Sequence, residues 1–200
     1  MEVYINEIGE LTCEAPTPQS TVSDLIDATL RFCRTHIDCS LCSHTCCSGL
    51  IVYADNIFIK NLSNTKLVTI DKQDSFELIL RVLKLDHTAK WTLAQNSDGK
   101  CIFLSREYRC LIYEARPLVC RMHTCIKCQQ SYIEMKNSLY YAYQQALKME
   151  MQNLLSSVKS PPDPYPNCTN PAFGMKNYDT LISDILKWSE ENQLSTKQRS

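Results

Sequence analysis

Apolar residues recur at helical spacing in three parts of the chain, and these repeats predict the main helices. The first predicted helix spans about residues 21–37, the longest spans about 131–159, and the last spans about 179–191. Thr21 or Ser23 can cap the first helix, since a hydroxyl at that place accepts a hydrogen bond from a free backbone N–H. The pattern therefore predicts a mostly helical protein.

Shorter apolar runs predict a smaller amount of β-structure. The run "LIVYA" at 50–54 is typical of a buried strand, and Asp55 can cap a short helix after it. Residues 76–85 fit a helix or a strand, because the run is too short for its period to decide. Two β-prone runs within 90–105 flank "NSDG", which is typical of a hairpin turn. Residues 1–20 are expected to be irregular.

Composition agrees with an ordinary globular chain. The sequence has 200 residues, of which 44% are apolar and 22% are charged. We therefore expect a single small α+β domain over residues 1–200, mostly helical, with a short β-hairpin around a cysteine-lined metal site. The net charge of −1 favours neither nucleic acid nor a membrane surface as a partner. The first residues do not form a secretory signal, and no apolar run is long enough to span a bilayer, so we expect a cytoplasmic location.

Cysteine is the residue that departs from ordinary composition. The chain has 12 cysteines, and "CSLCSHTCC" at 39–47 holds four of them. Nine cysteines lie between residues 39 and 128: Cys39, Cys42, Cys46, Cys47, Cys101, Cys110, Cys120, Cys125 and Cys128. A disulfide network, a metal site and a redox pair are the three alternatives. Because cytoplasmic thiols stay reduced, metal binding is favoured.

The spacing of these thiols suits metal chelation. A C-x2-C turn lets two thiolates converge on one ion, and zinc takes four such ligands. A [4Fe–4S] cluster also takes cysteines from short motifs together with remote ones. Cys46 and Cys47 are neighbours whose side chains diverge, so they are not expected to chelate the same ion. Eight or nine thiols fit two four-cysteine sites or one cluster with spare thiols, and both arrangements stay open.

A longer motif resembles a known family. "CIFLSREYRCLIYEARPLVCR" at 101–121, after the dense four-cysteine start, resembles the CxxCxxCC family of zinc- or iron-chelating domains. The resemblance covers about residues 39–128 and leaves a C-terminal helical extension, 131–193, outside it. It implies a metal-binding role for seven cysteines from Cys39 to Cys120, with Cys125 or Cys128 as an eighth ligand.

The first motif departs from the family pattern. Ser43 stands where a glycine is usual, and the second gap has three residues instead of two. "CSHTCC" is similar to part of the flagellin lysine N-methylase branch of the same family. That branch implies an iron–sulfur cluster and methyl transfer to lysine, but the rest of that enzyme is not recognisable in this chain.

Several neighbours of the cysteines bear on function. Arg116 and Arg121 are expected to lie beside the cofactor, where a guanidinium stabilises an anionic cluster. His44 and His123 also sit beside cysteine motifs, although a lone histidine is more often structural. The four glycines of the chain form neither G-x-G-x-x-G nor a P-loop.

These observations favour an iron–sulfur protein, most simply with a [4Fe–4S] cluster. It would support redox chemistry, or methyl transfer and modification of a protein or peptide substrate. Its partner would be that substrate or a redox protein. The alternative is a zinc-binding structural or partner-binding module without catalysis, because cysteine spacing does not separate iron from zinc. Whether the protein is an enzyme stays open.

Overall fold

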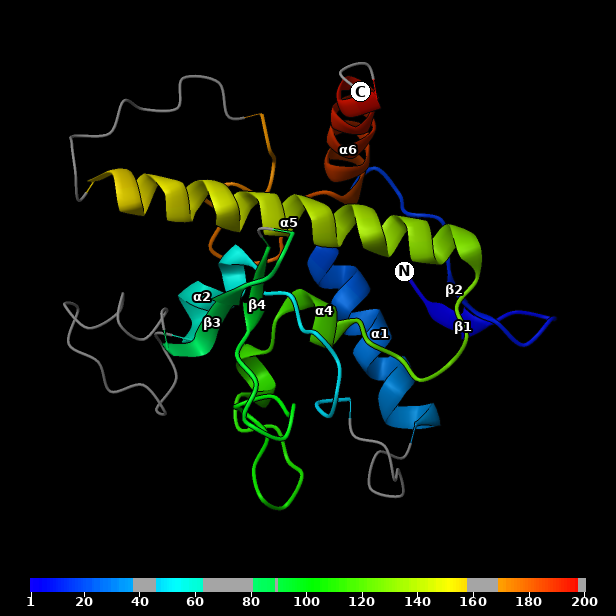
Figure 1. Cartoon of the computed structure of the whole chain (residues 1–200). Coiled ribbons are helices and arrows are strands. Elements are labelled where there is room, and N and C mark those ends of the chain that lie inside the picture. The colour runs from blue at the N-terminus through cyan, green and yellow to red at the C-terminus, as the bar shows by residue number, and fades with distance from the viewer. Residues whose placement is uncertain (38–45, 63–80, 89, 158–168, 198–200) are drawn as a thin grey trace.

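The computed structural model describes residues 1–37, 46–62, 81–88, 90–157 and 169–197 (Figure 1). The described residues are mostly helical and include two small antiparallel sheets of two strands each, which confirms the predicted α+β fold class. The helices and strands in chain order are β1 (Val3–Ile5), β2 (Leu11–Cys13), α1 (Val22–His36), α2 (Asn56–Leu62), β3 (Leu83–Leu85), β4 (Trp91–Leu93), the 3-10 turn η2 (Tyr113–Ala115), α4 (Leu118–Arg121), α5 (Gln130–Ser157) and α6 (Ile182–Lys197).

The first predicted helix is confirmed as α1, which begins one residue after Thr21. The Thr21 hydroxyl accepts a hydrogen bond from the Asp24 N–H, and the Asp24 carboxylate accepts one from the Thr21 N–H at 2.8 Å. This reciprocal capping box satisfies two backbone donors that a helix start leaves without partners. The buried face of α1, including Leu25 and Phe32, packs into the larger of two hydrophobic clusters.

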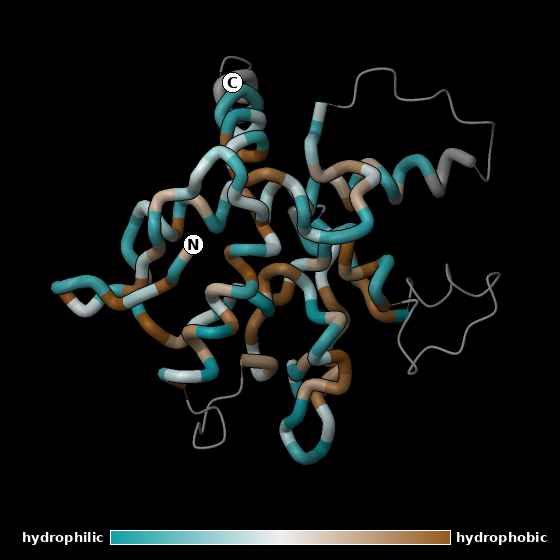
Figure 2. The backbone as a smooth tube through the Cα atoms, turned by 180° about the vertical axis from the view of Figure 1, so that it is seen from behind, coloured by the Kyte–Doolittle hydropathy of each residue, from teal (hydrophilic) through white to brown (hydrophobic). Residues whose placement is uncertain are grey.

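Helix α5 crosses the molecule and contributes to both hydrophobic clusters (Figure 1). Tyr132, Leu139 and Tyr143 lie in the larger cluster with α1, whereas Leu147 and Met151 pack in the smaller cluster with α2 and β3. In Figure 2, where the backbone is coloured by residue hydropathy, segments of apolar residues run through the middle of the fold. A single helix of 28 residues therefore joins the two parts of the core.

Backbone hydrogen bonds join the start of α1 to the start of α6. Thr21 forms an antiparallel bridge with Leu181, and the Ile182 N–H donates to the Ser20 carbonyl at 2.9 Å. Helix α6 then runs past Glu191, where its end was predicted, to Lys197. Its residues Ile182, Ile185 and Trp188 are buried in the larger cluster, as its apolar pattern predicts.

The segment before α1 is not irregular as expected, because it begins with a hairpin. Strands β1 and β2 pair antiparallel, with Val3 opposite Cys13. The Asn6 side chain accepts hydrogen bonds from the Ile8 and Glu10 N–H groups, and Gly9 takes a positive φ of 79°. The Asn6 side chain, the backbone hydrogen bonds between Asn6 and Glu10 and the left-handed Gly9 together form this turn between very short strands.

The middle of the chain forms the second sheet and the predicted turn. Strands β3 and β4 pair antiparallel, and the segment at 52–54 runs along the other side of β4 through one bridge, Tyr53 to Thr92. The run 50–54 is therefore only partly a strand, and Leu50 and Ile51 are exposed. "NSDG" forms the predicted tight turn, closed by the Gly99 N–H donating to the Asn96 carbonyl.

Asp55 connects three parts of the fold. Its Oδ1 accepts a hydrogen bond from the Phe58 N–H at 2.8 Å, which confirms the predicted cap of α2. Its Oδ2 accepts one from the Leu118 N–H at 2.7 Å, and the Tyr178 hydroxyl donates to Oδ1 at 3.0 Å. Asp55 is buried, and burial raises the pKa of its carboxyl. One side chain therefore fixes α4 against α2 and against the segment before α6.

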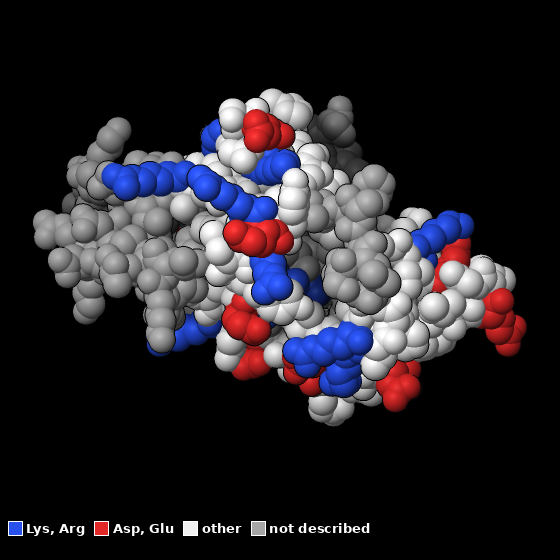
Figure 3. All heavy atoms as spheres, turned by 90° about the horizontal axis from the view of Figure 1, so that it is seen from below, with Lys and Arg blue, Asp and Glu red and all other residues white. Residues whose placement is uncertain are grey.

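None of the helices in the described ranges combines the length and the apolar character needed to cross a membrane. The face of the molecule in Figure 3 carries lysines and arginines interspersed with acidic residues.

Candidate metal centre

Four cysteines from three segments meet at one place, and we call Cys47, Cys101, Cys110 and Cys120 the interior thiol group. Each lies close enough to the other three for the charge of one thiolate to raise the pKa of another. Cys101 is buried and the other three are half-buried, against the smaller hydrophobic cluster. All four were predicted as metal ligands, and the structure brings them together.

Backbone pairing places the first three of these thiols. The Cys101 N–H donates to the Cys47 carbonyl at 2.9 Å, and Ser48 forms a bridge with Lys100 beside it. Cys101 then starts a second tight loop, in which Leu104 forms a bridge with Cys110. The eight residues between Cys101 and Cys110 therefore form one loop that brings these two cysteines together.

A side chain closes this loop. The Ser105 hydroxyl accepts hydrogen bonds from the N–H groups of Glu107 and Arg109, at 3.2 and 3.1 Å. Tyr108 takes a positive φ of 58°, which is uncommon for a residue with a side chain and marks a tight turn. The turn chemistry of "SREYR" therefore fixes the separation of Cys101 and Cys110.

Cys120 reaches the group from α4. Pro117 immediately precedes the helix, and its carbonyl accepts hydrogen bonds from the Cys120 and Arg121 N–H groups at 2.9 and 3.0 Å. Asp55 holds the first N–H of α4, that of Leu118. The rigid contact between Asp55 and α4 therefore sets the position of the fourth thiol.

Burial governs the acidity of the interior thiols. Loss of solvation is the largest cause and raises the pKa of Cys47 to about 11, with the neighbouring Cys101 and Cys110 raising it further. Burial likewise raises the pKa of Cys120. Backbone N–H groups act in the opposite direction, since those of Phe103 and Ile112 hydrogen-bond to the Cys101 and Cys110 sulfurs and lower their pKa values. A cation is therefore needed to stabilise the group as thiolates at neutral pH.

The two predicted cofactor arginines lie in different surroundings. The charge of Arg116 lowers the pKa of Cys47, Cys110 and Cys120, so its guanidinium lies beside the thiols. Both side chains donate to backbone carbonyl groups, Arg116 to that of Tyr113 at 2.8 Å and Arg121 to those of Glu114 and Arg116. The Arg121 guanidinium lies 5.7 Å from the centre of the Tyr178 ring, and its charge acts on Asp55. A cofactor role for either arginine stays a prediction.

A second group of donors lies beside the first, and we call Cys46, His123 and Cys125 the surface trio. One ligand atom of each residue lies within 4.8 Å of the others. Among the described residues, this is the one group of at least three histidine, cysteine or acidic side chains whose ligand atoms all lie that close together. The sequence favoured a structural role for His123, although "CRMHTC" at 120–125 places it between two cysteines.

Cys128 has different partners from both groups. The Lys136 ammonium donates to its sulfur at 3.2 Å, and the Thr124 hydroxyl lies 3.6 Å from the same atom. Cys125, the other candidate for an eighth ligand, belongs to the surface trio. Cys39 and Cys42, which were predicted as ligands, lie outside the described residues together with His44. Their metal-binding roles stay predictions.

Cys13 lies away from the candidate centres, on β2. Its surroundings include Glu14 and Lys136, and burial raises the pKa of its thiol to about 11.

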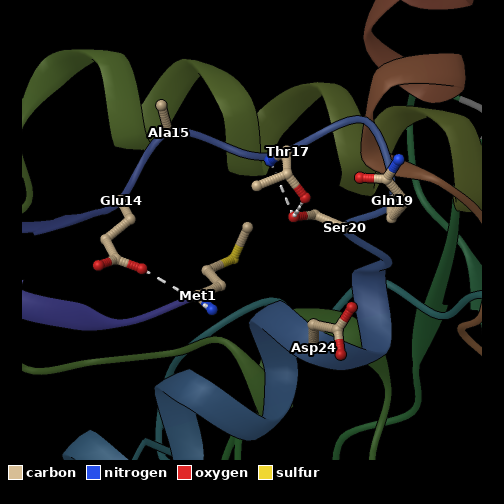
Figure 4. A pocket seen from close by; sticks show the side chains of 7 residues that line it. All are labelled: Met1, Glu14, Ala15, Thr17, Gln19, Ser20 and Asp24. Atoms are coloured by element: carbon tan, nitrogen blue, oxygen red, sulfur yellow. Dashed lines mark hydrogen bonds and ion pairs between the residues drawn. The ribbon is translucent and has the colours of Figure 1, made fainter.

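One small hollow lies at the start of the chain, between β2 and α1 (Figure 4). It is lined by Met1, Glu14, Ala15, Thr17, Gln19, Ser20 and Asp24. The N-terminal amino group lies 3.7 Å from the Glu14 carboxylate, and the Thr17 and Ser20 hydroxyls are 3.0 Å apart. The hollow contains none of the predicted ligands, so the cysteine groups remain the candidate site.

A cysteine-rich fold with thiols gathered on short loops defines a metal-chelating domain, and the comparison with known families agrees. Residues 38–140, more than half of the chain, match the family CxxCxxCC, described as "Putative zinc- or iron-chelating domain". The chain belongs to this family. The match extends past residue 128, where the resemblance was expected to end, into the first part of α5. No curated protein and no solved structure shows a significant match to the chain.

Proposed function

We propose that the interior thiol group binds an iron–sulfur cluster, most simply of the [4Fe–4S] type, and that the protein acts in redox chemistry. The observation that carries the proposal is the mutual proximity of all four thiols, in which Cys47 joins three cysteines of the distant segment 101–120. Four cysteine ligands are the set that such a cluster takes. Family membership supports the coarser conclusion, chelation of iron or zinc.

The spacing of the interior group favours a cluster over a single ion. In a tetrahedral zinc site, Zn–S bonds of about 2.3 Å place the sulfurs only about 3.8 Å apart. A cluster separates its thiolates more widely, because each sulfur binds a different iron atom. The interior thiols are close enough to influence one another electrostatically. Among the described residues, however, only the surface trio has three donors within 4.8 Å of one another, so no three interior sulfurs are that close.

The surroundings of the group favour a redox role. The positive charge of Arg116 would stabilise the more negative, reduced form of a bound cluster. The N–H groups of Phe103 and Ile112 would act in the same direction, since hydrogen bonds to ligating sulfurs raise a reduction potential. The reaction partner would be an electron-carrying protein, or a protein or peptide that the cluster helps to modify, as in the methyl-transfer branch of the family.

Anaerobic purification tests the proposal. We expect brown protein that absorbs broadly near about 400 nm, a range typical of thiolate-bound iron–sulfur centres. Iron and acid-labile sulfide should be present in equal amounts, at about four of each per chain. The variant Cys110→Ser should lose the colour and the iron. Colourless protein with stoichiometric zinc and no iron would contradict the proposal and would establish the alternative, a zinc-stabilised module without redox chemistry.

A further inference from the structure

We propose that the surface trio, Cys46, His123 and Cys125, forms a second metal centre that takes a zinc ion and is separate from the interior thiol group. The three donors come from two segments, one just before the pairing of Ser48 with Lys100 and one just after α4. This proposal is independent of which metal the interior group binds.

The geometry of the trio suits a single ion. The ligand atoms of all three residues lie within 4.8 Å of one another, and a tetrahedral zinc ion needs separations of about 3.8 Å. Small rotations of exposed side chains are sufficient to close this difference, and Cys46 and Cys125 are both exposed. Two thiolates and one imidazole are a donor set that zinc takes readily, with a water or another ligand in the fourth position.

The trio is separate from the interior group because its residues face another way. Cys46 and Cys47 are adjacent in a turn, and the two side chains differ in burial and in neighbours. Cys47 is half-buried beside Cys101, whereas Cys46 is exposed beside His123. On the other segment, Cys120 faces the interior from α4, and the chain leaves that helix before it reaches His123.

The neighbouring Cys128 provides a matched control, because it is close in sequence but is not part of the trio. Its sulfur accepts a hydrogen bond from Lys136 at 3.2 Å and donates one to the Ile126 carbonyl at 3.5 Å. Those contacts hold it on the side of α5, apart from the three clustered donors. A thiol variant at this position therefore changes the cysteine count without changing the proposed centre.

The experiment is metal analysis of the full-length protein, purified anaerobically and equilibrated with zinc before free metal is removed. We expect one zinc per chain in addition to the metal of the interior group. The variants His123→Ala and Cys125→Ser should each lose that one zinc and retain wild-type iron and sulfide. Cobalt replacing this zinc should give visible bands that are lost in His123→Ala, because the imidazole is a direct ligand. Cys128→Ser should match the wild type in every measurement.

These measurements distinguish a failure of this proposal from a failure of the iron–sulfur proposal. If the wild type holds two zinc ions and no iron, loss of one ion in His123→Ala still supports the second centre. If His123→Ala and Cys125→Ser both retain the full zinc content and the wild-type cobalt bands, the second centre is overturned. Circular dichroism of each variant checks that it is folded. Cys46→Ser is a third variant that should lose the same zinc ion.

Discussion

Two adjacent cysteines, Cys46 and Cys47, lie in contrasting environments. Cys47 is half-buried with three other thiols, and its pKa is raised by burial to about 11. Cys46 is exposed and lies beside an imidazole and an exposed thiol. The contrast shows that the double cysteine of the motif serves two regions. An interior thiol group built by backbone pairing therefore lies next to a surface trio built by two loops.

The two regions also differ in what holds them. Hydrogen bonds of the loops after Cys101 and the contact of Asp55 with α4 fix the interior group. The trio lies on turns that flank these elements. We therefore expect loss of the interior metal to affect the whole fold, and loss of the surface metal to affect only its own site.

The largest expected effect comes from removing an interior ligand. Cys110→Ser should lower the free energy of unfolding by about 3 kcal/mol or more, because the metal links segments distant in sequence and its binding is folding free energy. Thermal melting of the metal-loaded protein measures this change. Cys125→Ser is the matched surface variant and should shift the melting temperature by only a few degrees. Equal losses in the two variants would remove the distinction between the regions.

Asp55→Ala should follow in size, with a loss of about 2–3 kcal/mol. The variant leaves the N–H groups of Phe58 and Leu118 and the Tyr178 hydroxyl without their acceptor. Because Asp55 positions α4, the interior group should bind metal more weakly, while the surface zinc is retained. Chemical denaturation and metal analysis of the same samples measure both effects. A variant with wild-type stability would contradict the role assigned to Asp55.

The same residue predicts a pH dependence. Burial raises the pKa of the Asp55 carboxyl in the folded protein, so the folded state holds this proton more tightly than the unfolded state does. The contribution of Asp55 to stability is therefore greatest below the unfolded pKa of about 3.9 and falls as pH rises through the folded pKa. Asp55→Asn should flatten this part of the stability profile. An unchanged slope would contradict the prediction.

Arg116 and Arg121 allow a finer comparison. Arg116→Gln should retain the metal and lower the reduction potential by on the order of 50 mV, because a cation beside the thiols is lost. Arg121→Gln should leave the potential nearly unchanged and lower stability, since this side chain binds two backbone carbonyl groups and its charge acts on Asp55. Redox titration and thermal melting of both variants measure these effects. A larger potential shift in Arg121→Gln would reverse the two roles.

The smallest effect is a difference in thiol reactivity in the metal-free protein. The exposed Cys46 and Cys125 should react with iodoacetamide before Cys47 does. A thiol with a pKa of about 11 is almost entirely protonated at pH 8, and only the thiolate is nucleophilic. Mass spectrometry of timed samples gives the order of modification. Early modification of Cys47 would show that the interior group opens when metal is absent.

The sequence predicted the helices well because their periodic patterns are long. Thr21 marked the start of α1, and the apolar stripe of α5 reappears as its buried face. Short elements were harder to predict. The β1–β2 hairpin depends on one Asn side chain, and the exposure of Leu50 and Ile51 depends on tertiary packing that local sequence does not contain.

The candidate site was predicted as a set of residues but not as an arrangement. Spacing predicted nine cysteines as ligands without indicating which of them meet in the interior group, and it left open whether Cys46 and Cys47 serve two ions or two irons of one cluster. Spacing alone did not separate Cys125 from Cys128. What distinguishes them is the hydrogen bond from Lys136 of α5 to the Cys128 sulfur, which local spacing does not reveal. His123 was underestimated for the same reason, since its value as a donor depends on Cys46, which is distant in sequence.

The bridge between Thr21 and Leu181 has a consequence for the order of events during synthesis. Ser20 and the first residues of α1 form backbone hydrogen bonds with Tyr178, Thr180 and Ile182, which leave the ribosome more than 150 residues later. All four interior cysteines emerge well before that point, since the last of them is Cys120. A nascent chain of 150 residues therefore already contains all four interior thiols for metal loading, whereas the start of α1 gains these partners only after residue 182 has been made.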